Sequence, residues 1–296
     1  MTIRPFDYIE ANDLARVTST LAEAGSEAVL LAGGTDLLIM LKHGTIRPRL
    51  VINIKGISAL SGIHNDKGQV HIGPLTKLRE LETSALIRDK LPALQEAASR
   101  LGSLQIRQIA TVGGNLCRAA PCAETAPPLL IYDSRVHIAG PDGERTVPLD
   151  EYFTGPGEIV LTRGEVLKEI EIPALPAQAG GAYLRHSVRQ VMDLALVNVA
   201  AYLLLEEDGE TIAEARIALG SVAPTPMRAR RAEQALRGET VSADLFVEAG
   251  RLAAEESKPI SDVRSSDDYR RTITEEFTRR VLDQALTRCK GRISSV

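Results

Sequence analysis

The spacing of apolar residues divides the chain into three segments, and the first of them has the pattern of a β-α-β unit. A helical spacing over residues 11–24 is followed by a buried strand at 27–32 and a short helix at 36–41. A second buried strand follows at 50–54. A strand, a helix and a strand within about thirty residues predict a parallel pairing.

The second segment, from about residue 56, mixes both periodicities. The expected elements are strands at 57–63 and 70–74 around a polar turn at 65–68, helices at 75–84, 92–102 and 127–132, and strands at 135–139, 144–147 and 166–172. The dipeptide Asp142-Gly143 is a hairpin signal between two of these strands. This pattern predicts a mixed sheet with helices packed on it.

The third segment begins after a stretch rich in Pro, Ala and Gly at 173–181, which is the best candidate for a domain boundary. Three strands are expected at 181–189, 197–206 and 214–221, followed by helices at 228–236, 243–257 and 266–287. The chain is therefore expected to be α+β. One domain is expected at 1–175, with subdomains at about 1–55 and 56–175, and a second domain at 178–290.

Composition excludes several classes of function. The chain has 296 residues, is 44% hydrophobic and carries a net charge of −4, so it has a sizeable core and no basic footprint for nucleic acid. No apolar run reaches the ~18 residues of a membrane span. The first residues lack the apolar core of a signal peptide, and three cysteines fit a reducing compartment. We therefore expect a cytoplasmic protein without a membrane span.

Two glycine pairs carry the candidate chemistry. One lies in LLAGGTD, residues 30–36, and the other in TVGGN, residues 111–115. The first pair follows a strand and precedes a helix capped by Thr35 or Asp36, which predicts free backbone N–H groups aimed at an anion. We interpret both as loops around the diphosphate of one dinucleotide. The alternative is two ordinary tight turns, and neither sequence fits the Rossmann or P-loop pattern.

Six motifs, taken together and in order, resemble one protein family. They are LLAGGTDLL (30–38), IRQIATVGGNL (106–116), APPLL (126–130), GEVLKEIEIP (164–173), AYLRHSVRQVMDLALVNVA (182–200) and SSDDYRR (265–271). The chain resembles the FAD-binding (medium) subunits of the molybdenum hydroxylase family. This family includes the flavoprotein subunits of carbon monoxide dehydrogenase and xanthine dehydrogenase, and the β subunit of 4-hydroxybenzoyl-CoA reductase.

The resemblance implies both a fold and a set of partners. It implies a two-part FAD-binding domain of the vanillyl-alcohol oxidase type, then a C-terminal domain with a three-stranded antiparallel sheet and a helical bundle. FAD would take electrons from the [2Fe–2S] clusters of a small subunit and pass them to an external acceptor. A large subunit would carry the molybdenum cofactor, in a dimer of heterotrimers. The large subunit would select the substrate, so the sequence of this chain identifies neither the substrate of the complex nor its electron acceptor.

The resemblance also implies cofactor contacts for particular residues, none of them catalytic. They are Val29, Leu30, Leu31, Ala32, Gly33, Gly34, Thr35, Asp36, Thr111, Gly113, Gly114, Asn115, Glu124, Leu167 and Arg185. The two glycine loops would hold the diphosphate and ribityl region, and residues 29–32 would place backbone beside the flavin. Glu124 would hold an adenosine ribose hydroxyl. Arg185 would face the flavin ring, and Leu167 would supply a backbone contact to the adenine or the ring.

Structural alternatives stand beside these roles. Glu124 is also suited to the start of a helix, Leu167 and Tyr183 to the core, and Arg185 to a solvated strand face. Arg189 and Asp193 are expected to form a structural ion pair in the same region.

The cysteines and histidines predict no metal centre. The C-x4-C pair, Cys117 and Cys122, lacks the four thiolates of an iron–sulfur cluster and is expected to pack as small apolar residues. The histidines show no metal-ligand spacing; they are His43, His64, His71, His137 and His186.

Three functions remain open from the sequence. The first is an electron-transferring flavin subunit. The second is a free-standing flavin oxidase or reductase, which needs an acid or base beside the flavin, and no convincing candidate is found. The third is a subunit that has lost FAD, which the intact glycine loops oppose.

Overall fold

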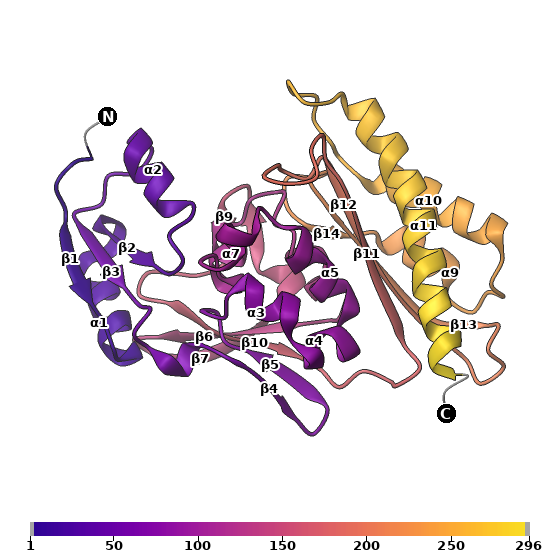
Figure 1. Cartoon of the computed structure of the whole chain (residues 1–296), viewed down its shortest axis with the longest axis horizontal. Coiled ribbons are helices and arrows are strands. Elements are labelled where there is room, and N and C mark those ends of the chain that lie inside the picture. Colours follow the sequence, from indigo (N-terminus) through magenta and orange to yellow (C-terminus); the bar gives the residue numbers. More distant parts are fainter. Residues whose placement is uncertain (1–2, 294–296) are drawn as a thin grey trace.

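The computed structural model describes residues 3–293 and consists of three parts that lie side by side in chain order (Figure 1). The N-terminal part has the elements β1 (Asp7–Glu10), α1 (Leu14–Ala24), β2 (Ala28–Leu31), α2 (Leu37–His43) and β3 (Leu50–Asn53). Its sheet has the order β1-β3-β2, with both pairs parallel. The predicted β-α-β unit is confirmed. The sequence missed β1 because this short strand is largely exposed and lacks an apolar run.

The middle part contains a five-stranded sheet of order β4-β5-β10-β6-β7. Its strands are β4 (Ile63–Asp66), β5 (Gln69–Ile72), β6 (Arg135–Gly140), β7 (Gly143–Pro148) and β10 (Val166–Ile172). Every pairing in it is antiparallel, so the prediction of a mixed sheet was wrong. The strand predicted at 57–63 was also wrong. Ser58–Leu60 forms a 3₁₀ turn instead, and the buried Ile57 and Leu60 fit its three-residue repeat.

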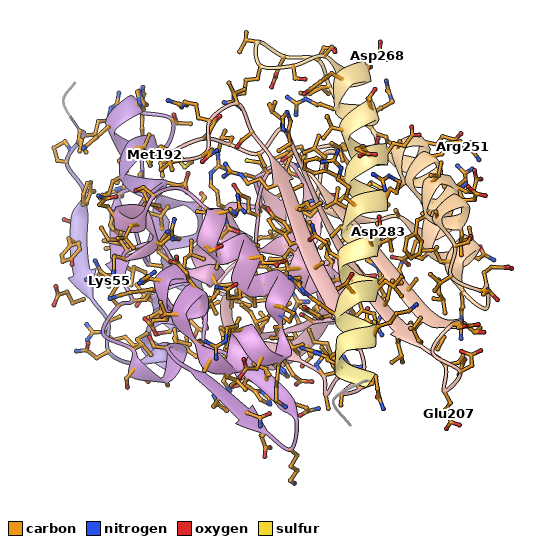
Figure 2. All side chains as sticks on the ribbon, turned by 45° about the vertical axis from the view of Figure 1, so that its right-hand side comes forward. Lys55, Met192, Glu207, Arg251, Asp268 and Asp283 are labelled. Carbon is orange, nitrogen blue, oxygen red and sulfur yellow. The ribbon has the colours of Figure 1, made fainter. Side chains whose placement is uncertain are left out.

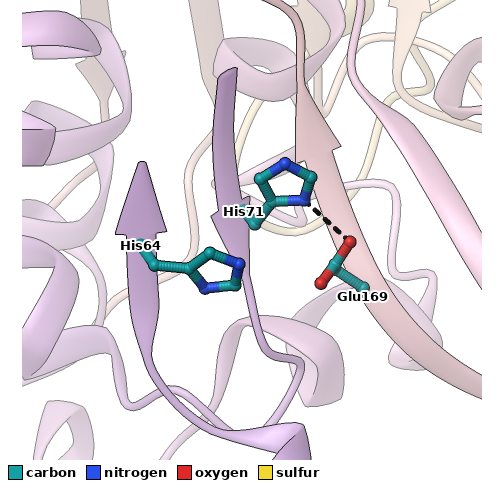
Figure 3. Close-up of side chains that lie close together, drawn as sticks. All are labelled: His64, His71 and Glu169. Carbon is teal, nitrogen blue, oxygen red and sulfur yellow. Dashed lines mark hydrogen bonds and ion pairs between the residues drawn. The ribbon is translucent and has the colours of Figure 1, made fainter. Parts of the chain in front are cut away.

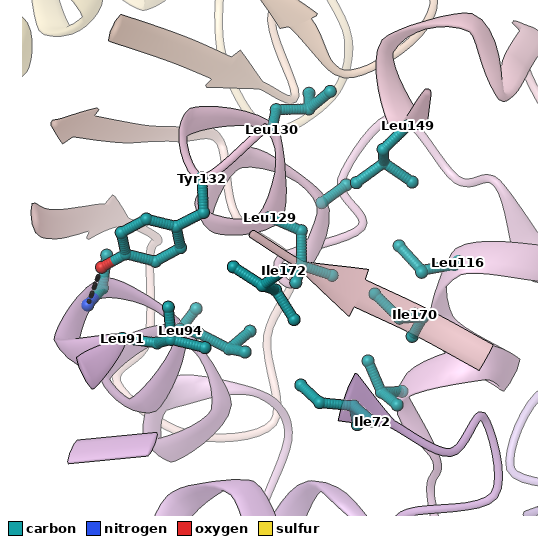
Figure 4. Packing of buried hydrophobic residues seen from close by; sticks show 14 of the residues in the cluster. Ile72, Leu91, Leu94, Leu116, Leu129, Leu130, Tyr132, Leu149, Ile170 and Ile172 are labelled. Atoms are coloured by element: carbon teal, nitrogen blue, oxygen red, sulfur yellow. Dashed lines mark hydrogen bonds between the residues drawn. The ribbon is translucent and has the colours of Figure 1, made fainter. Parts of the chain in front are cut away.

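Short helices and a small hairpin accompany this sheet. They are α3 (Leu78–Thr83), α4 (Ala85–Lys90), α5 (Pro92–Arg100), α6 (Leu104–Arg107), α7 (Val112–Arg118) and α8 (Ala126–Ile131), with the hairpin β8 (Phe153–Gly155) and β9 (Glu158–Ile159). Figure 4 shows the core between helices and sheet, where Leu94 and Leu116 meet Ile170 and Ile172 of β10. The hydroxyl of the buried Tyr132 accepts a hydrogen bond from Ala93 N at 3.2 Å. One face of the sheet is thus covered by apolar packing.

The C-terminal part is a second antiparallel sheet with three helices on one side (Figure 1). Its elements are β11 (Gly180–His186), β12 (Val197–Leu205), β13 (Ile212–Gly220), β14 (Met227–Arg228), α9 (Arg230–Leu236), α10 (Ala243–Glu256) and α11 (Asp267–Ile293). The three predicted strands and three helices are present. The sheet is four-stranded, because the chain after Pro226 adds the two-residue β14 beside β13. Two residues are too few to give a periodic signal.

The middle and C-terminal parts pack directly against each other. α5 packs on β11, and α8 packs on β12 and β13. Arginines of the C-terminal sheet reach across: Arg216 Nη1 donates to Ile131 O at 3.1 Å, and Arg228 Nη1 donates to Asp133 Oδ1 at 2.8 Å. Among residues 3–293, no helix is long and apolar enough to cross a membrane.

Candidate functional site

The two glycine segments meet where the N-terminal and middle parts touch. A Cβ atom on Gly33 would lie 2.4 Å from Ile109 O and 2.9 Å from Ala110 Cα, so the backbones are in contact only because residue 33 has no side chain. Ala110 immediately precedes Thr111, the first residue of the second glycine segment. The structure thus brings the two segments together at one place.

Replacing Gly33 by alanine is expected to destabilise this junction. The added Cβ must push the rigid backbone of Ile109 away, because no flexible side chain is there to give. Overpacking of this kind costs about 1–3 kcal/mol. Urea unfolding of the FAD-free protein measures the effect. Gly291→Ala is the control, since a Cβ at Gly291 meets no atom within 4 Å and Gly291 has no positive φ. A loss of stability for Gly33→Ala no larger than that for Gly291→Ala contradicts the close approach.

The first segment leaves a row of backbone donors free. Gly34 has a φ of +81°, which turns the chain after β2 toward α2. Within residues 3–293, the backbone N–H groups of residues 33–37 have no protein acceptor. Asp36 occupies the N-cap position of α2, one of the two predicted, but its side chain makes no capping hydrogen bond. Unpaired consecutive N–H groups are suited to bind an anion such as a diphosphate.

The second segment differs from the expected loop, because it is the start of helix α7. Thr111 is its N-cap and accepts a hydrogen bond from Gly114 N at 3.1 Å. Val112 N donates to Thr76 O, and Gly113 N donates to Pro74 O. These donors are therefore already used within the protein, and neither glycine of this pair has a positive φ.

The two glycines of α7 have different surroundings. A Cβ on Gly113 would lie 2.4 Å from Pro74 Cβ and 2.7 Å from Pro74 O, so Gly113 is required for packing. Gly114 is exposed, and a Cβ there would meet only Thr111 Oγ1, at 2.9 Å. The backbone conformation does not require glycine at 114, and the one protein atom that an added Cβ would crowd is the Thr111 hydroxyl that caps α7. The bare surface of Gly114 leaves room for a bound group.

Asn115 of α7 bonds within the middle part, and the nearby Glu124 connects that part to β11. Asn115 Oδ1 accepts hydrogen bonds from the hydroxyl and the N–H of Thr125, at 2.6 and 3.3 Å. The neighbouring Glu124 is buried, and its Oε1 lies 3.2 Å from Arg185 Nε, outside hydrogen-bond geometry. Its Oε2 accepts a hydrogen bond from the Tyr183 hydroxyl at 3.5 Å. Arg185 is therefore not a solvated strand residue: its side chain is 4% exposed, and that of Glu124 is 5% exposed.

Burial changes the proton affinity of these groups. It raises the pKa of Glu124 to about 7, and the neighbouring Arg185 guanidinium opposes this shift. Burial also raises the pKa of Cys122, and the negative charges of Glu124 and, to a smaller extent, Asp36 add to it. Cys122, two residues before Glu124, therefore lies close enough to the first glycine segment for the negative charge of Asp36 to raise its pKa.

Arg185 also holds the connection between β11 and β12. Its guanidinium donates to Arg100 O at 2.9 Å and to Asp193 O. This connection reaches the middle part, where Met192 N donates to Gly102 O at 3.0 Å (Figure 2). Arg189 N donates to Asp193 Oδ2 at 2.8 Å, and its guanidinium lies 3.9 Å from that carboxylate, which fits the predicted structural pair.

The other residues singled out in the sequence differ in how deeply they are buried. Residues 29–32 lie on or directly after β2, and Thr35 lies in the turn before α2. The side chains of Leu167 and Tyr183 belong to the core, as their structural alternatives predicted. Cys117 Sγ lies 3.2 Å from the Tyr152 hydroxyl, and burial raises the pKa of this thiol to about 11.

Sequence reasoning missed the apolar border of the site. Leu38 and Ile39 on α2, and Leu104 and Ile109 before α7, are large apolar side chains that stay exposed near the glycine segments. Exposed apolar surface of this kind marks a ligand or partner site. The sequence has apolar residues beside each glycine pair, but their spacing does not tell which of them stay exposed.

Free backbone N–H groups lie at the junction of the N-terminal and middle parts, and an antiparallel sheet with helices follows in the chain. These features fit the class of nucleotide-binding proteins of mixed fold. Comparison with known families makes this specific. Residues 4–175 match the family described as the FAD binding domain in molybdopterin dehydrogenase. Residues 182–285 match the CO dehydrogenase flavoprotein C-terminal domain. The chain belongs to this family of FAD-binding dehydrogenase subunits.

Relatives match over almost the whole chain. The xanthine dehydrogenase FAD-binding subunit of Escherichia coli O157:H7 is 34% identical and the alignment covers 97% of this chain and 98% of the relative. The carbon monoxide dehydrogenase medium chain of Hydrogenophaga pseudoflava is 31% identical over 96% of this chain and 98% of its own length.

Solved structures agree with this assignment. A chain of the carbon monoxide dehydrogenase from Hydrogenophaga pseudoflava superposes with a TM-score of 0.94 at 32% identity, covering 98% of this chain and all of that one. A chain of quinoline 2-oxidoreductase from Pseudomonas putida 86 superposes with a TM-score of 0.90 at 28% identity, covering 99% and 100%. The predicted family is confirmed, the chain is an oxidoreductase subunit, and its cofactor is FAD.

Proposed function

We propose that this chain is the FAD-carrying electron-transfer subunit of a molybdenum and iron–sulfur hydroxylase complex. It takes electrons from [2Fe–2S] clusters of a small partner subunit and passes them to an external acceptor. A large subunit with the molybdenum cofactor oxidises the substrate, and the complex is a dimer of heterotrimers. The free cysteines fit a reducing compartment, so we place the complex in the cytoplasm. Bound FAD supplies the electron-carrying chemistry, and this chain holds it.

The observation that carries this proposal is the row of unpaired N–H groups at residues 33–37, facing a junction that Gly33 closes. Those groups bind the FAD diphosphate, with Thr35 and Asp36 toward the ribityl chain. Gly114 leaves space for the cofactor. Thr111, Gly113 and Asn115 hold the start of α7 in place, since their polar groups bond within the protein.

The other proposed cofactor contacts are inferred from where each residue lies relative to the glycine segments. Residues 29–32 place backbone beside the ring where β2 ends, and Leu167 contributes only backbone. The carboxylate oxygens of Glu124 face Arg185 and Tyr183, so we propose that Glu124 acts on the flavin through Arg185. In this proposal Glu124 makes no ribose contact, because its side chain is buried against Arg185 and Tyr183. Arg185 is buried to the same degree and donates to Arg100 O and Asp193 O, so it acts on the flavin through its charge and not by direct contact.

The relatives support the choice of partners. Those named above are subunits of xanthine and carbon monoxide dehydrogenases, and one matching structure is described as a Cu,Mo-CO dehydrogenase. A free-standing flavin oxidase would need an acid or base beside the ring. At this site, within residues 3–293, Glu124 is the carboxyl group whose pKa burial raises to about 7, and it is buried against Arg185 and Tyr183.

Purification from the native source tests this function. The chain is expected to bring down an iron–sulfur subunit and a molybdenum-containing subunit, detected by mass spectrometry and metal analysis. The same chain produced alone is expected to hold FAD that dithionite reduces and that small organic substrates do not. A flavin-loaded chain that purifies alone and oxidises a substrate contradicts the proposal.

A further inference from the structure

A stripe of histidine and glutamate side chains crosses the five-stranded sheet on the face opposite its apolar core. His64 on β4 and His71 on β5 are paired in register, and Glu169 follows on β10 (Figure 3). Along β5 and β10 the neighbouring Ile72 and Ile170 are buried in the core. Because side chains alternate along a strand, the stripe lies on the other face.

The three side chains converge on one point. Each offers a ligand atom, and these atoms all lie within 4.8 Å of one another. His71 Nδ1 is 2.8 Å from Glu169 Oε1, and the His64 and His71 rings are stacked with centroids 4.9 Å apart and planes 7° apart. They come from three neighbouring strands, so the sheet fixes their backbones. Because the two rings are stacked and nearly parallel, the exposed His64 ring must turn out of the stack to direct a nitrogen at the same ion as His71.

His64 is the residue whose placement protein contacts do not explain. Within residues 3–293 its side chain makes no hydrogen bond or ion pair, and its only contact of note is the stacked ring of His71. A metal ion bound by both imidazole rings and the carboxylate would give the exposed His64 side chain a defined position.

We propose that His64, His71 and Glu169 form a binding site for a divalent transition-metal ion of the Zn²⁺ type. Two imidazole nitrogens and one carboxylate oxygen are a ligand set that Zn²⁺ accepts, with water completing the coordination on the open face. On binding, the metal takes the place of the hydrogen bond between His71 and Glu169, and the proton of that hydrogen bond is released to solvent.

A second histidine–glutamate pair supports this set from the neighbouring strand. His137 Nε2 lies 2.7 Å from Glu171 Oε2 and 3.9 Å from Glu169 Oε1. His137 Nδ1 is in turn 3.0 Å from Thr146 Oγ1 on β7. His137 is therefore bonded to Glu171 and not to the ligand Glu169, and Glu171 adds a second carboxylate near the site, which favours a cation.

The site differs in place and role from the flavin site. It lies on the sheet face away from the core, whereas the glycine segments lie among the helices. A bound ion would tie the edge hairpin β4–β5 to the central strand β10, so its expected effect is on the stability of the middle part. The inference therefore does not depend on the proposed electron-transfer function.

Zinc titration of the FAD-loaded chain tests the site. After removal of metals with a chelator, ZnCl₂ is titrated by calorimetry, and Co²⁺ is used as a spectroscopic probe of histidine ligation. We expect one equivalent bound, with a rise in the midpoint of thermal unfolding. His64→Gln is expected to weaken binding by at least about tenfold and to remove the thermal shift, since it takes away one ligand. His64 has no hydrogen-bonding role, so this variant is expected to fold.

Two further variants complete the test. His43→Gln removes a histidine on α2, outside this sheet, and is expected to bind Zn²⁺ like the unchanged protein. Glu169→Gln keeps the shape of the side chain, removes the carboxylate ligand and is expected to weaken binding as His64→Gln does. The absence of a bound equivalent, or equal affinity in all variants, overturns the site, and the flavin absorbance of each sample shows that the FAD site is intact.

Discussion

Gly114→Val is expected to abolish FAD binding while leaving the fold intact. The protein should purify without the visible absorbance of flavin, and added FAD should bind at least about tenfold more weakly, a change of about 1.4 kcal/mol or more. Flavin absorbance per mole of protein and a fluorescence titration with FAD measure the effect.

The physical reason is that a valine side chain would fill the bare surface at position 114, where the one protein atom it would crowd is the Thr111 hydroxyl. The residue lies in helix α7 with an ordinary φ, is exposed, and faces only Thr111 Oγ1 within 4 Å of a Cβ. Glycine inside a helix costs about 1 kcal/mol relative to alanine, and valine costs less than glycine. A helix that keeps glycine there gives up stability for open space, which we assign to the cofactor.

The control is the same substitution at Gly291, a glycine of helix α11 whose added Cβ meets no atom within 4 Å. Gly291→Val should keep its FAD. Circular dichroism and the thermal unfolding midpoint show whether each variant folds. Stoichiometric FAD in a folded Gly114→Val protein would contradict the assignment of this surface.

Strands and helices with a strong apolar pattern were predictable from the sequence. β10 lies at Val166–Ile172, as predicted, because its apolar residues fill the core between helices and sheet. The strands of the C-terminal sheet were found within a few residues for the same reason. β1 and β14 were missed, because one is largely exposed and the other has two residues. Strands this short form because they can pair with the edge of a neighbouring strand, β3 for β1 and β13 for β14.

At the site, the sequence indicated the two glycine segments but not their different roles. Four glycines look alike in a sequence, yet Gly33 closes the junction, Gly34 makes the turn, Gly113 packs on Pro74 and Gly114 leaves a surface bare. These roles depend on which backbone lies opposite, which only tertiary structure decides.

Side-chain partners from distant strands were also beyond the sequence. The Glu124–Arg185 pair and the His64–His71–Glu169 cluster each join segments far apart in the chain. The spacing of histidines along the chain predicted no metal site, because β4 and β5 bring two of them together only across a hairpin, and β10 supplies the carboxylate. Pairing in a sheet creates neighbours that a linear motif does not show.

The Glu124–Arg185 pair leads to the second large expected effect, on the reduction potential of FAD. Reduction adds negative charge to the flavin, and a nearby cation stabilises it. Arg185→Met is therefore expected to lower the midpoint potential, and Glu124→Gln is expected to raise it, each on the order of 30 mV, which is about 1.4 kcal/mol for a two-electron couple. Spectroelectrochemical titration of the FAD-loaded chain measures both.

The opposite signs separate an electrostatic role from a structural one. Arg185→Met leaves the buried Glu124 carboxylate without its cation, so it also loses stability, by about 3–5 kcal/mol where the carboxylate stays ionised. Arg216→Met is the matched control, since Arg216 also joins the C-terminal sheet to the middle part through Ile131 O. It should lose stability without a change in potential. If Arg185→Met and Glu124→Gln leave the potential unchanged, or shift it in the same direction, the pair does not act on the flavin, and Arg185 only joins β11 to the end of α5.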